Sequence, residues 1–202
     1  MLTKRPSTIW EGNDNDLLDW LPEFSLRREV KTIIDVTAGR KRFYKNNKYS
    51  NIVKCFDLVP QCKDVVKADF RCLPIKSNSC EVIIFDPPHI SETGKNSLIS
   101  HKCGFGDSGE ENISNLFEPS LKEFKRILVD DGVILAKVAD QVHRNSFQIQ
   151  HVDFINECRK QNLRVCTIFL KIRKNSIMGL WKQVLHPRSF NCYWIVVRKG
   201  KC

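Results

Sequence analysis

Five short apolar runs, each separated from the next by a longer polar segment, limit what this chain can fold into more than any other feature. They cover residues 32–36, 52–56, 65–68, 81–85 and 133–138. The runs are largely continuous rather than alternating, which is typical of strands buried on both faces of a sheet. We therefore expect an α/β fold with an open, mostly parallel sheet.

Helical patterns lie between and after these runs. Ahead of the fifth run, apolar residues recur at steps of three and four and predict a helix with one buried face. These residues are Ile113, Leu116, Phe117, Leu121, Phe124, Ile127 and Leu128. Pro119 lies inside the pattern, so we expect a kink or a new helix start there. A second helix is predicted over residues 152–161.

The two ends of the chain differ from the middle. Two further apolar runs, residues 165–172 and 192–197, have no strong helical pattern between them, which predicts a C-terminal antiparallel hairpin. Residues 1–30 are polar with scattered aromatic residues, and we interpret them as an N-terminal flap with a short helix that ends near Pro22. Residues 31–202 are predicted to form one domain.

Composition narrows the class of protein. No apolar run approaches the roughly 20 residues that cross a bilayer, and the N-terminus lacks the apolar core of a signal peptide, so we expect a cytoplasmic protein. Nine cysteines without C-x-x-C spacing predict reduced, mostly buried thiols. His101 and Cys103 are too few ligands for zinc, and no metal site is predicted. The net charge of +10 favours a polyanionic partner.

Acidic residues follow several of the predicted strands, at the edge where open α/β sheets bind ligands. Asp57 lies 22 residues after Asp35, and this spacing is typical of an acid that binds ribose hydroxyls. Asp69 can accept a hydrogen bond from an adenine amino group, and Phe70 can stack on the ring. Taken singly, each acid could also be a helix cap or a plain strand end.

Small residues follow the first strand, in a turn that lets the backbone approach a ligand closely. The turn consists of Asp35, Val36, Thr37, Ala38 and Gly39.

The fourth strand ends in Asp86-Pro87-Pro88-His89. Two consecutive prolines offer no backbone donors and fix two φ angles, so they continue a regular element poorly. They hold a carboxylate and a carbonyl rigidly at a strand end. We interpret these four residues as a reaction centre, with His89 either stacking on a substrate or bonding to backbone.

With these residues in order, the chain resembles class I SAM-dependent methyltransferases (SAM, S-adenosylmethionine). The closest resemblance is to nucleic-acid amino-methyltransferases with a (D/N/S)-P-P-(Y/F/W/H) motif, including small phage and prokaryotic enzymes in which Asp-Pro-Pro-His precedes a Gly-Lys segment, here Gly94-Lys95. The resemblance covers about residues 32–140 in order, and it implies a Rossmann-like methyltransferase fold.

The resemblance also implies the cofactor and the residues that bind it. SAM would lie on the turn after the first strand, with Asp57 on the ribose and Asp69 and Phe70 near the adenine. The turn would contribute Asp35, Thr37, Ala38 and Gly39. The Asp86 carboxylate and the Pro87 carbonyl would accept the two hydrogens of an exocyclic amine, and His89 would stack on an extruded base.

The implied reaction is methyl transfer to N6 of adenine or N4 of cytosine, with DNA favoured over RNA. An RNA methyltransferase, a protein methyltransferase acting on a glutamine amide, and a non-catalytic nucleic-acid-binding module remain alternatives. Residues 90–112, with four glycines, are interpreted as a substrate loop or lid. Aromatic and cationic residues near the C-terminus suit either base binding or core packing: Trp181, Lys182, His186, Arg188, Tyr193 and Trp194.

Overall fold

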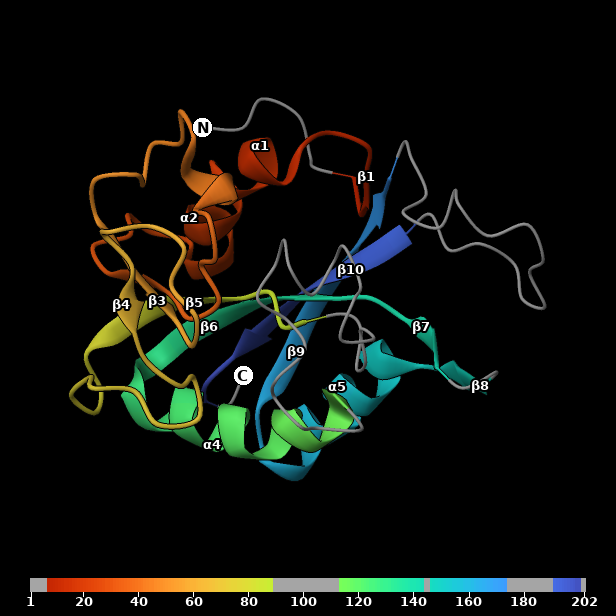
Figure 1. The fold of residues 1–202 in the computed structure, drawn as a ribbon. Coiled ribbons are helices and arrows are strands. Elements are labelled where there is room, and N and C mark those ends of the chain that lie inside the picture. Colours follow the sequence, from red (N-terminus) through yellow and green to blue (C-terminus); the bar gives the residue numbers. More distant parts are fainter. Residues whose placement is uncertain (1–6, 89–112, 144–145, 174–190, 201–202) are drawn as a thin grey trace.

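A computed structural model describes residues 7–88, 113–143, 146–173 and 191–200. Within these ranges eight strands form one sheet, in the spatial order β1-β9-β10-β6-β5-β2-β3-β4 (Figure 1). In chain order the strands are β1 (Ile9–Trp10), β2 (Ile33–Asp35), β3 (Val53–Asp57), β4 (Val66–Lys67), β5 (Cys80–Phe85), β6 (Leu128–Val138), β9 (Arg164–Ile172) and β10 (Asn191–Arg198). A separate small hairpin consists of β7 (Gln141–His143) and β8 (Ser146–Gln148).

The sheet confirms the predicted α/β architecture. Strands β2 to β6 pair in parallel, so their carboxyl ends meet at one edge. The predicted antiparallel hairpin is formed by β9 and β10. β10 also pairs antiparallel with β6 and therefore lies between β6 and β9, inside the sheet.

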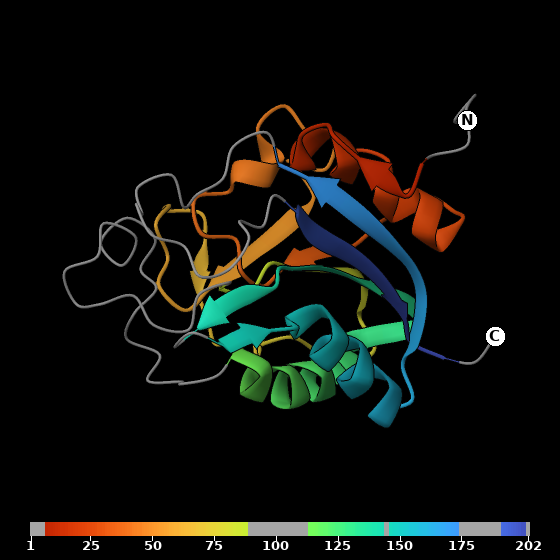
Figure 2. The same ribbon diagram turned by 90° about the vertical axis from the view of Figure 1, so that its right-hand side faces the viewer.

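Helices cover both faces of the sheet (Figures 1 and 2). One face carries the 3-10 turn η2 (Ile113–Leu116), α4 (Phe117–Ile127) and α5 (Gln150–Lys160). The other carries α1 (Asp14–Leu18), α2 (Leu21–Leu26) and the 3-10 turn η1 (Arg42–Tyr44). We call them the α4/α5 face and the α1/α2 face.

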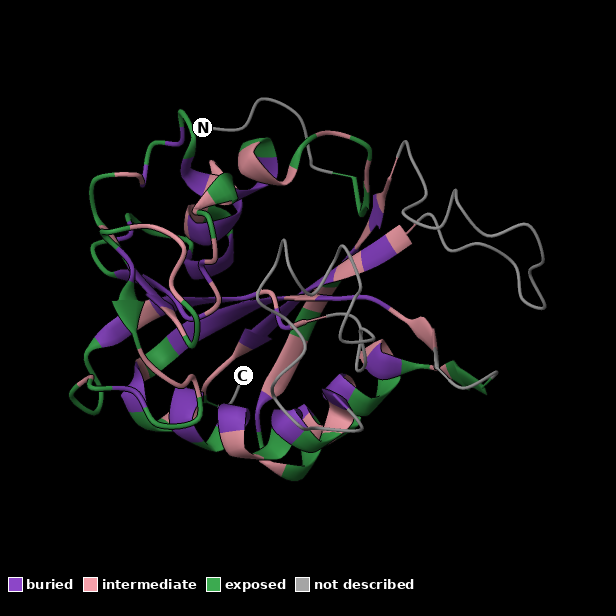
Figure 3. Ribbon diagram, viewed as in Figure 1, coloured by how far each residue is buried: buried purple, intermediate pink, exposed green. Residues whose placement is uncertain are grey.

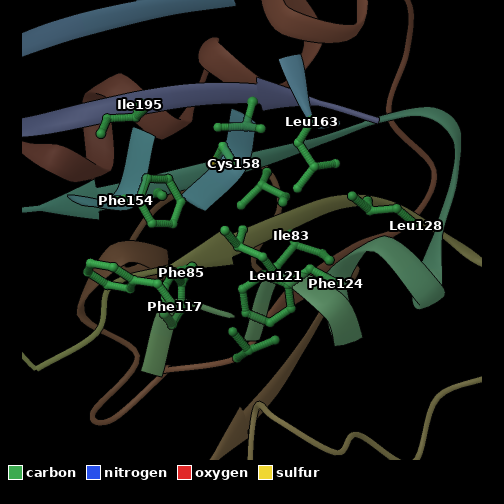
Figure 4. Packing of buried hydrophobic residues seen from close by; sticks show 14 of the residues in the cluster. Ile83, Phe85, Phe117, Leu121, Phe124, Leu128, Phe154, Cys158, Leu163 and Ile195 are labelled. Carbon is green, nitrogen blue, oxygen red and sulfur yellow. The ribbon is translucent and has the colours of Figure 1, made fainter. Parts of the chain in front are cut away.

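Strand β5 shows why the sheet is buried on both sides. Side chains alternate along a strand, so Val82 and Ile84 pack into the core on the α1/α2 face while Ile83 and Phe85 pack on the α4/α5 face. All four are at most 1% exposed. The burial runs along the whole centre of the sheet (Figure 3), and Figure 4 shows the core beneath α4 and α5. Because both faces of β5 are covered at these four residues, each of them must be apolar, which explains the continuous apolar run in the sequence.

Two prolines lie near helix starts. Pro119 lies in the first turn of α4, which restarts after η2 as predicted, and a missing N–H costs nothing there. The sequence predicted one short helix that ends near Pro22, and this prediction is wrong. Pro22 lies in the first turn of a second helix, α2, after α1 has ended at Leu18.

The N-terminal residues pack closely on the sheet. β1 pairs in parallel with β9 and forms the edge of the sheet, and Trp20 makes edge-to-face contact with Phe169 of β9 at 5.8 Å between ring centroids. Leu17, Leu18 and Leu21 are fully buried on the α1/α2 face. This packing fixes the start of α1, with Asp14, above the sheet.

The entry to β6 differs from the prediction. The expected turn at residues 130–132 lies inside β6, where Asp131 has a φ of 62° and the pairing with β5 shifts register. A Cβ on Gly132 would meet the Val129 carbonyl oxygen at 2.9 Å, so only glycine fits there.

The described cysteines are all free thiols. Cys55, Cys80, Cys158 and Cys192 are buried, whereas Cys72 and Cys166 are exposed, so the prediction of buried thiols holds for only part of the set. In the same ranges, no helix is long and apolar enough to cross a membrane.

Candidate active site

Asp35 ends β2 but points into the protein rather than toward solvent. It is 1% exposed, and its two carboxylate oxygens accept hydrogen bonds from the Thr37 backbone N–H (2.9 Å) and the Tyr44 hydroxyl (2.8 Å). Burial raises the pKa of Asp35 to about 7, although both hydrogen bonds act in the opposite direction. The geometry suits a residue that shapes the turn. Its direct contact with a cofactor stays a prediction.

Thr37 connects this turn to the Asp-Pro-Pro motif. Its Oγ1 accepts a hydrogen bond from the backbone N–H of Asp86 over 2.7 Å. Ala38 is buried, and its N–H donates to the Phe56 carbonyl of β3. The turn is therefore fixed to both neighbouring strands.

Asp57 lies where the sequence placed it, at the end of β3 and beside the turn. Its Oδ2 accepts the Gly39 N–H at 2.7 Å, and its Oδ1 accepts the Val59 N–H at 2.8 Å. Gly39 has a φ of +49°, a left-handed conformation that favours glycine. The carboxylate is thus held firmly and keeps further lone pairs for a ligand.

Asp69 and Phe70 follow β4, and each contacts a neighbouring side chain of the protein. Asp69 forms a two-pronged ion pair with Arg71, whose guanidinium lowers the pKa of the carboxyl. Phe70 packs on the α4/α5 face, 5.4 Å from Phe85 between ring centroids. An adenine-binding role for either residue stays a prediction.

Asp86, Pro87 and Pro88 continue directly from β5 at the carboxyl edge of the sheet. Pro87 is buried, and the Asp86 side chain is 22% exposed. His89 and Gly94-Lys95 lie outside the described residues, as do the predicted lid and residues 181–188. Of the C-terminal aromatic residues, Trp194 is fully buried, which supports the interpretation that it packs in the core.

Lys137 on β6 lies beside this motif, and the sequence analysis did not single it out. Its Nζ is 3.5 Å from Oδ2 of Asp86 and 2.9 Å from Oδ2 of Asp14. The sequence does contain a signal for Lys137, because a lysine inside the apolar run 133–138 must find a partner for its charge. Its partner Asp14 could be found only from the fold.

A second polar cluster follows β6. Nδ1 of His151 lies 2.7 Å from Oδ1 of Asp140, and the imidazole stacks on the ring of Tyr193 at 4.0 Å. In the described part of the chain, no three His, Cys, Asp or Glu side chains are grouped to hold a metal.

Comparison with known proteins shows which solved structures have a similar fold. The chain matches no family model and no curated protein. Among solved structures it is similar to the cyclase SpnF, with a TM-score of 0.55, 10% identity, and coverage of 94% of this chain and 86% of that one. A SAM-dependent methyltransferase from Leishmania major gives a TM-score of 0.53 at 12% identity, over 91% of this chain and 72% of that one.

A third similar structure is a SAM-dependent methyltransferase from Thermotoga maritima, described as a possible histamine N-methyltransferase. Its TM-score is 0.51 at 12% identity, over 93% of this chain and 91% of that one. The chain therefore has the Rossmann-like fold of class I SAM-dependent methyltransferases. Because one of these proteins is a cyclase, the reaction must be argued from the site.

Proposed function

We propose that this chain is a SAM-dependent methyltransferase that acts on an exocyclic amino group of a nucleobase, N6 of adenine or N4 of cytosine, in a nucleic acid. The observation that carries the proposal is Asp86-Pro87-Pro88 at the end of β5, hydrogen-bonded through Thr37 to the turn after β2. Open α/β sheets bind their ligands at this edge.

The residues at the edge fit SAM. The left-handed Gly39 leaves the backbone open beside Asp57, and the Asp57 carboxylate is fixed by two backbone N–H groups. Asp57 would accept the ribose hydroxyls, and the turn from Thr37 to Gly39 would lie under the cofactor. When bound there, SAM supplies an electrophilic methyl group on its sulfonium.

The role of Asp86 follows from the chemistry of the acceptor. The lone pair of an exocyclic amine is delocalised into the base, so the amine is a poor nucleophile. Hydrogen bonds from its two hydrogens to the Asp86 carboxylate and the Pro87 carbonyl localise that pair on nitrogen. Pro87 is buried and its φ is fixed, so both acceptors are held in place before the substrate binds.

The atoms balance without further reactants. The nitrogen–carbon bond forms as the sulfur–carbon bond breaks, and the electron pair of the broken bond stays on sulfur. The methylated nitrogen then carries one proton too many, which passes to Asp86 directly or through a water molecule. Asp86 thus acts first as a hydrogen-bond acceptor and then as a proton acceptor.

A nucleic acid is the favoured substrate because the chain carries a net charge of +10. Arg42 and Lys45 are exposed close to the turn after β2 and suit contacts with phosphate. We favour DNA over RNA.

The test is methyl transfer from labelled SAM to DNA, RNA and protein, followed by mass spectrometry of the digested products. We expect N6-methyladenine or N4-methylcytosine. Asp86→Ala should lower turnover by orders of magnitude with folding and SAM binding retained. Asp130→Ala is the matched control, because Asp130 is an exposed acid at the opposite edge of the sheet. Label on glutamine, on 5-methylcytosine or on nothing would refute the proposed reaction.

A further inference from the structure

Lys137 is a cation in the interior of the sheet. Its side chain is 12% exposed, although the strand around it is apolar and fully buried between Ile134 and Ala136. An unpaired charge in such a place is very costly. The contacts of Lys137 must therefore offset that cost.

Strand register brings Lys137 beside the reaction centre. Phe85 pairs with Ala136 across β5 and β6, so the next residues along these parallel strands, Asp86 and Lys137, are neighbours. On the other side of β6, Lys137 pairs with Trp194 of β10. Side chains alternate along strands, so Lys137 and Trp194 share the α1/α2 face with Ile84 and Leu135.

Four groups enclose the ammonium. Oδ2 of Asp14 lies at 2.9 Å and Oδ2 of Asp86 at 3.5 Å. The ring of Phe43 lies 5.1 Å away and the indole of Trp194 lies 6.0 Å away, both within range of a cation–π interaction. Lys137 is thus held by carboxylates and aromatic faces together.

Asp14 is itself fixed, which decides how Lys137 is shared between the two acids. The indole N–H of Trp194 donates to Oδ1 of Asp14 over 2.9 Å, and this leaves Oδ2 for Lys137. The ammonium therefore has one short anchor, Asp14, and one longer contact, Asp86. The longer contact places positive charge beside the Asp86 carboxylate.

The charge of Lys137 is set by its burial and by the acidic groups that face it. Asp86 in turn opposes ionisation of the buried Asp35. The groups that act on Lys137 are Asp86 after β5, Asp14 of α1 and the Cys192 thiol of β10. Burial disfavours its charge, but attraction to Asp86 and Asp14 outweighs burial and raises the pKa of Lys137. The residue remains an ammonium at neutral pH and cannot act as a base.

We propose that Lys137 is a positioning residue of the reaction centre: anchored by Asp14 and Trp194, it holds the Asp86 carboxylate ionised and oriented toward the acceptor amine. The proposal rests on the function proposed above for Asp86. It also gives the N-terminal segment a part in the site, since Asp14 belongs to α1.

The test measures the titration of the Asp86 carboxyl by NMR of protein labelled with carbon-13 in its aspartate side chains. The signal of Asp86 is identified by its loss in Asp86→Asn. In Lys137→Met, which keeps length but loses charge, the Asp86 midpoint should rise by about one pH unit or more. Lys137→Arg should restore most of the shift. Lys199→Met is the matched control, because the side chain of Lys199 is also only 15% exposed, and it bonds to the Leu128 carbonyl at the other end of β6.

Turnover supplies the second readout. Lys137→Met should lower kcat by about tenfold, a barrier change of about 1.4 kcal/mol, with little change in KM for SAM, and should move the acid limb of the pH profile upward with the NMR midpoint. A structural role alone would lower stability without moving that limb. Lys137→Gln, which keeps a donor for Asp14, serves if the methionine variant does not fold.

An unchanged Asp86 midpoint in a folded variant would overturn the proposal. So would a wild-type midpoint above about 5, well over the usual range for aspartate, and that measurement needs no variant. The titration needs no substrate either. A protein that methylates nothing would therefore defeat the proposed function while leaving the pairing of Lys137 with Asp86 open to its own test.

Discussion

Thr37 and Asp86 are joined by a 2.7 Å hydrogen bond from the Asp86 backbone N–H to the Thr37 hydroxyl oxygen. The turn after β2 and the motif after β5 therefore hold one another in position. We assign these two segments to the cofactor and to the acceptor, so in the proposed reaction their relative position sets the distance over which the methyl group moves.

Thr37→Val should weaken this connection, because valine keeps the shape and leaves the Asp86 N–H without its acceptor. We expect a loss of about 1–3 kcal/mol in the free energy of unfolding and a fall in kcat. Thr37→Ser keeps the oxygen and is the control. Equal stability and turnover in the valine and serine variants would show that the bond contributes nothing.

Asp35 should make stability depend on pH. Burial raises its pKa from an ordinary 3.8 to about 7, so between these values the folded protein holds a proton that the unfolded chain has released. This contribution to stability is fully present below about pH 4 and is lost as pH rises through about 7, by an amount on the order of a few kcal/mol.

Asp35→Asn removes that titration while the amide can still bond to Thr37 and Tyr44. In urea unfolding at a series of pH values, the free energy of unfolding of the variant should rise relative to that of the wild type as pH rises from about 4 to about 7. A difference between the two proteins that stays constant over this range would contradict the raised pKa of Asp35.

Asp57→Ala should weaken SAM binding by about 1–3 kcal/mol, because charge-assisted hydrogen bonds to the ribose are lost. Isothermal titration calorimetry measures the effect directly. Asp64→Ala is the control, since Asp64 is an exposed acid nearby that pairs with Lys41. An Asp57 variant that binds SAM as tightly as the control would remove Asp57 from the site.

Binding to nucleic acid should weaken steeply as salt rises, because contacts with phosphate release counterions. Arg42→Ala and Lys45→Ala should each reduce the salt slope by about one. Lys122→Ala tests a cation elsewhere, on α4, where it pairs with Glu118. A flat salt response, or no binding at low salt, would favour a protein or small-molecule substrate.

Much of the fold was predictable because its signals are local. The runs that became β2, β3, β5 and β6 are continuous in hydrophobicity, and the fold demands this where each strand is covered on two faces. The place of β10 inside the sheet was not predictable, because the same hairpin sequence could close the sheet in either order.

The candidate site was also predictable only in part. The sequence could place Asp57 and Asp86 at the carboxyl edge because each lies at the end of a strand, and all parallel strands end at one edge. Tyr44 and Asp14 were missed because their partners, Asp35 and Lys137, are chosen by packing on the α1/α2 face. Asp69 was assigned to adenine, but the strength of its ion pair with Arg71, two residues further on, depends on a side-chain geometry that sequence spacing does not define.

β10 follows β9 in the chain but separates it from β6 in the sheet. A nascent chain that has made β9 can therefore not yet close its sheet, and the apolar edge of β6 stays open until β10 has left the ribosome. Trp194 then meets Asp14, 180 residues earlier, in a late and entropically costly closure. Until that moment the chain displays an unpaired strand edge, the kind of surface through which nascent chains aggregate.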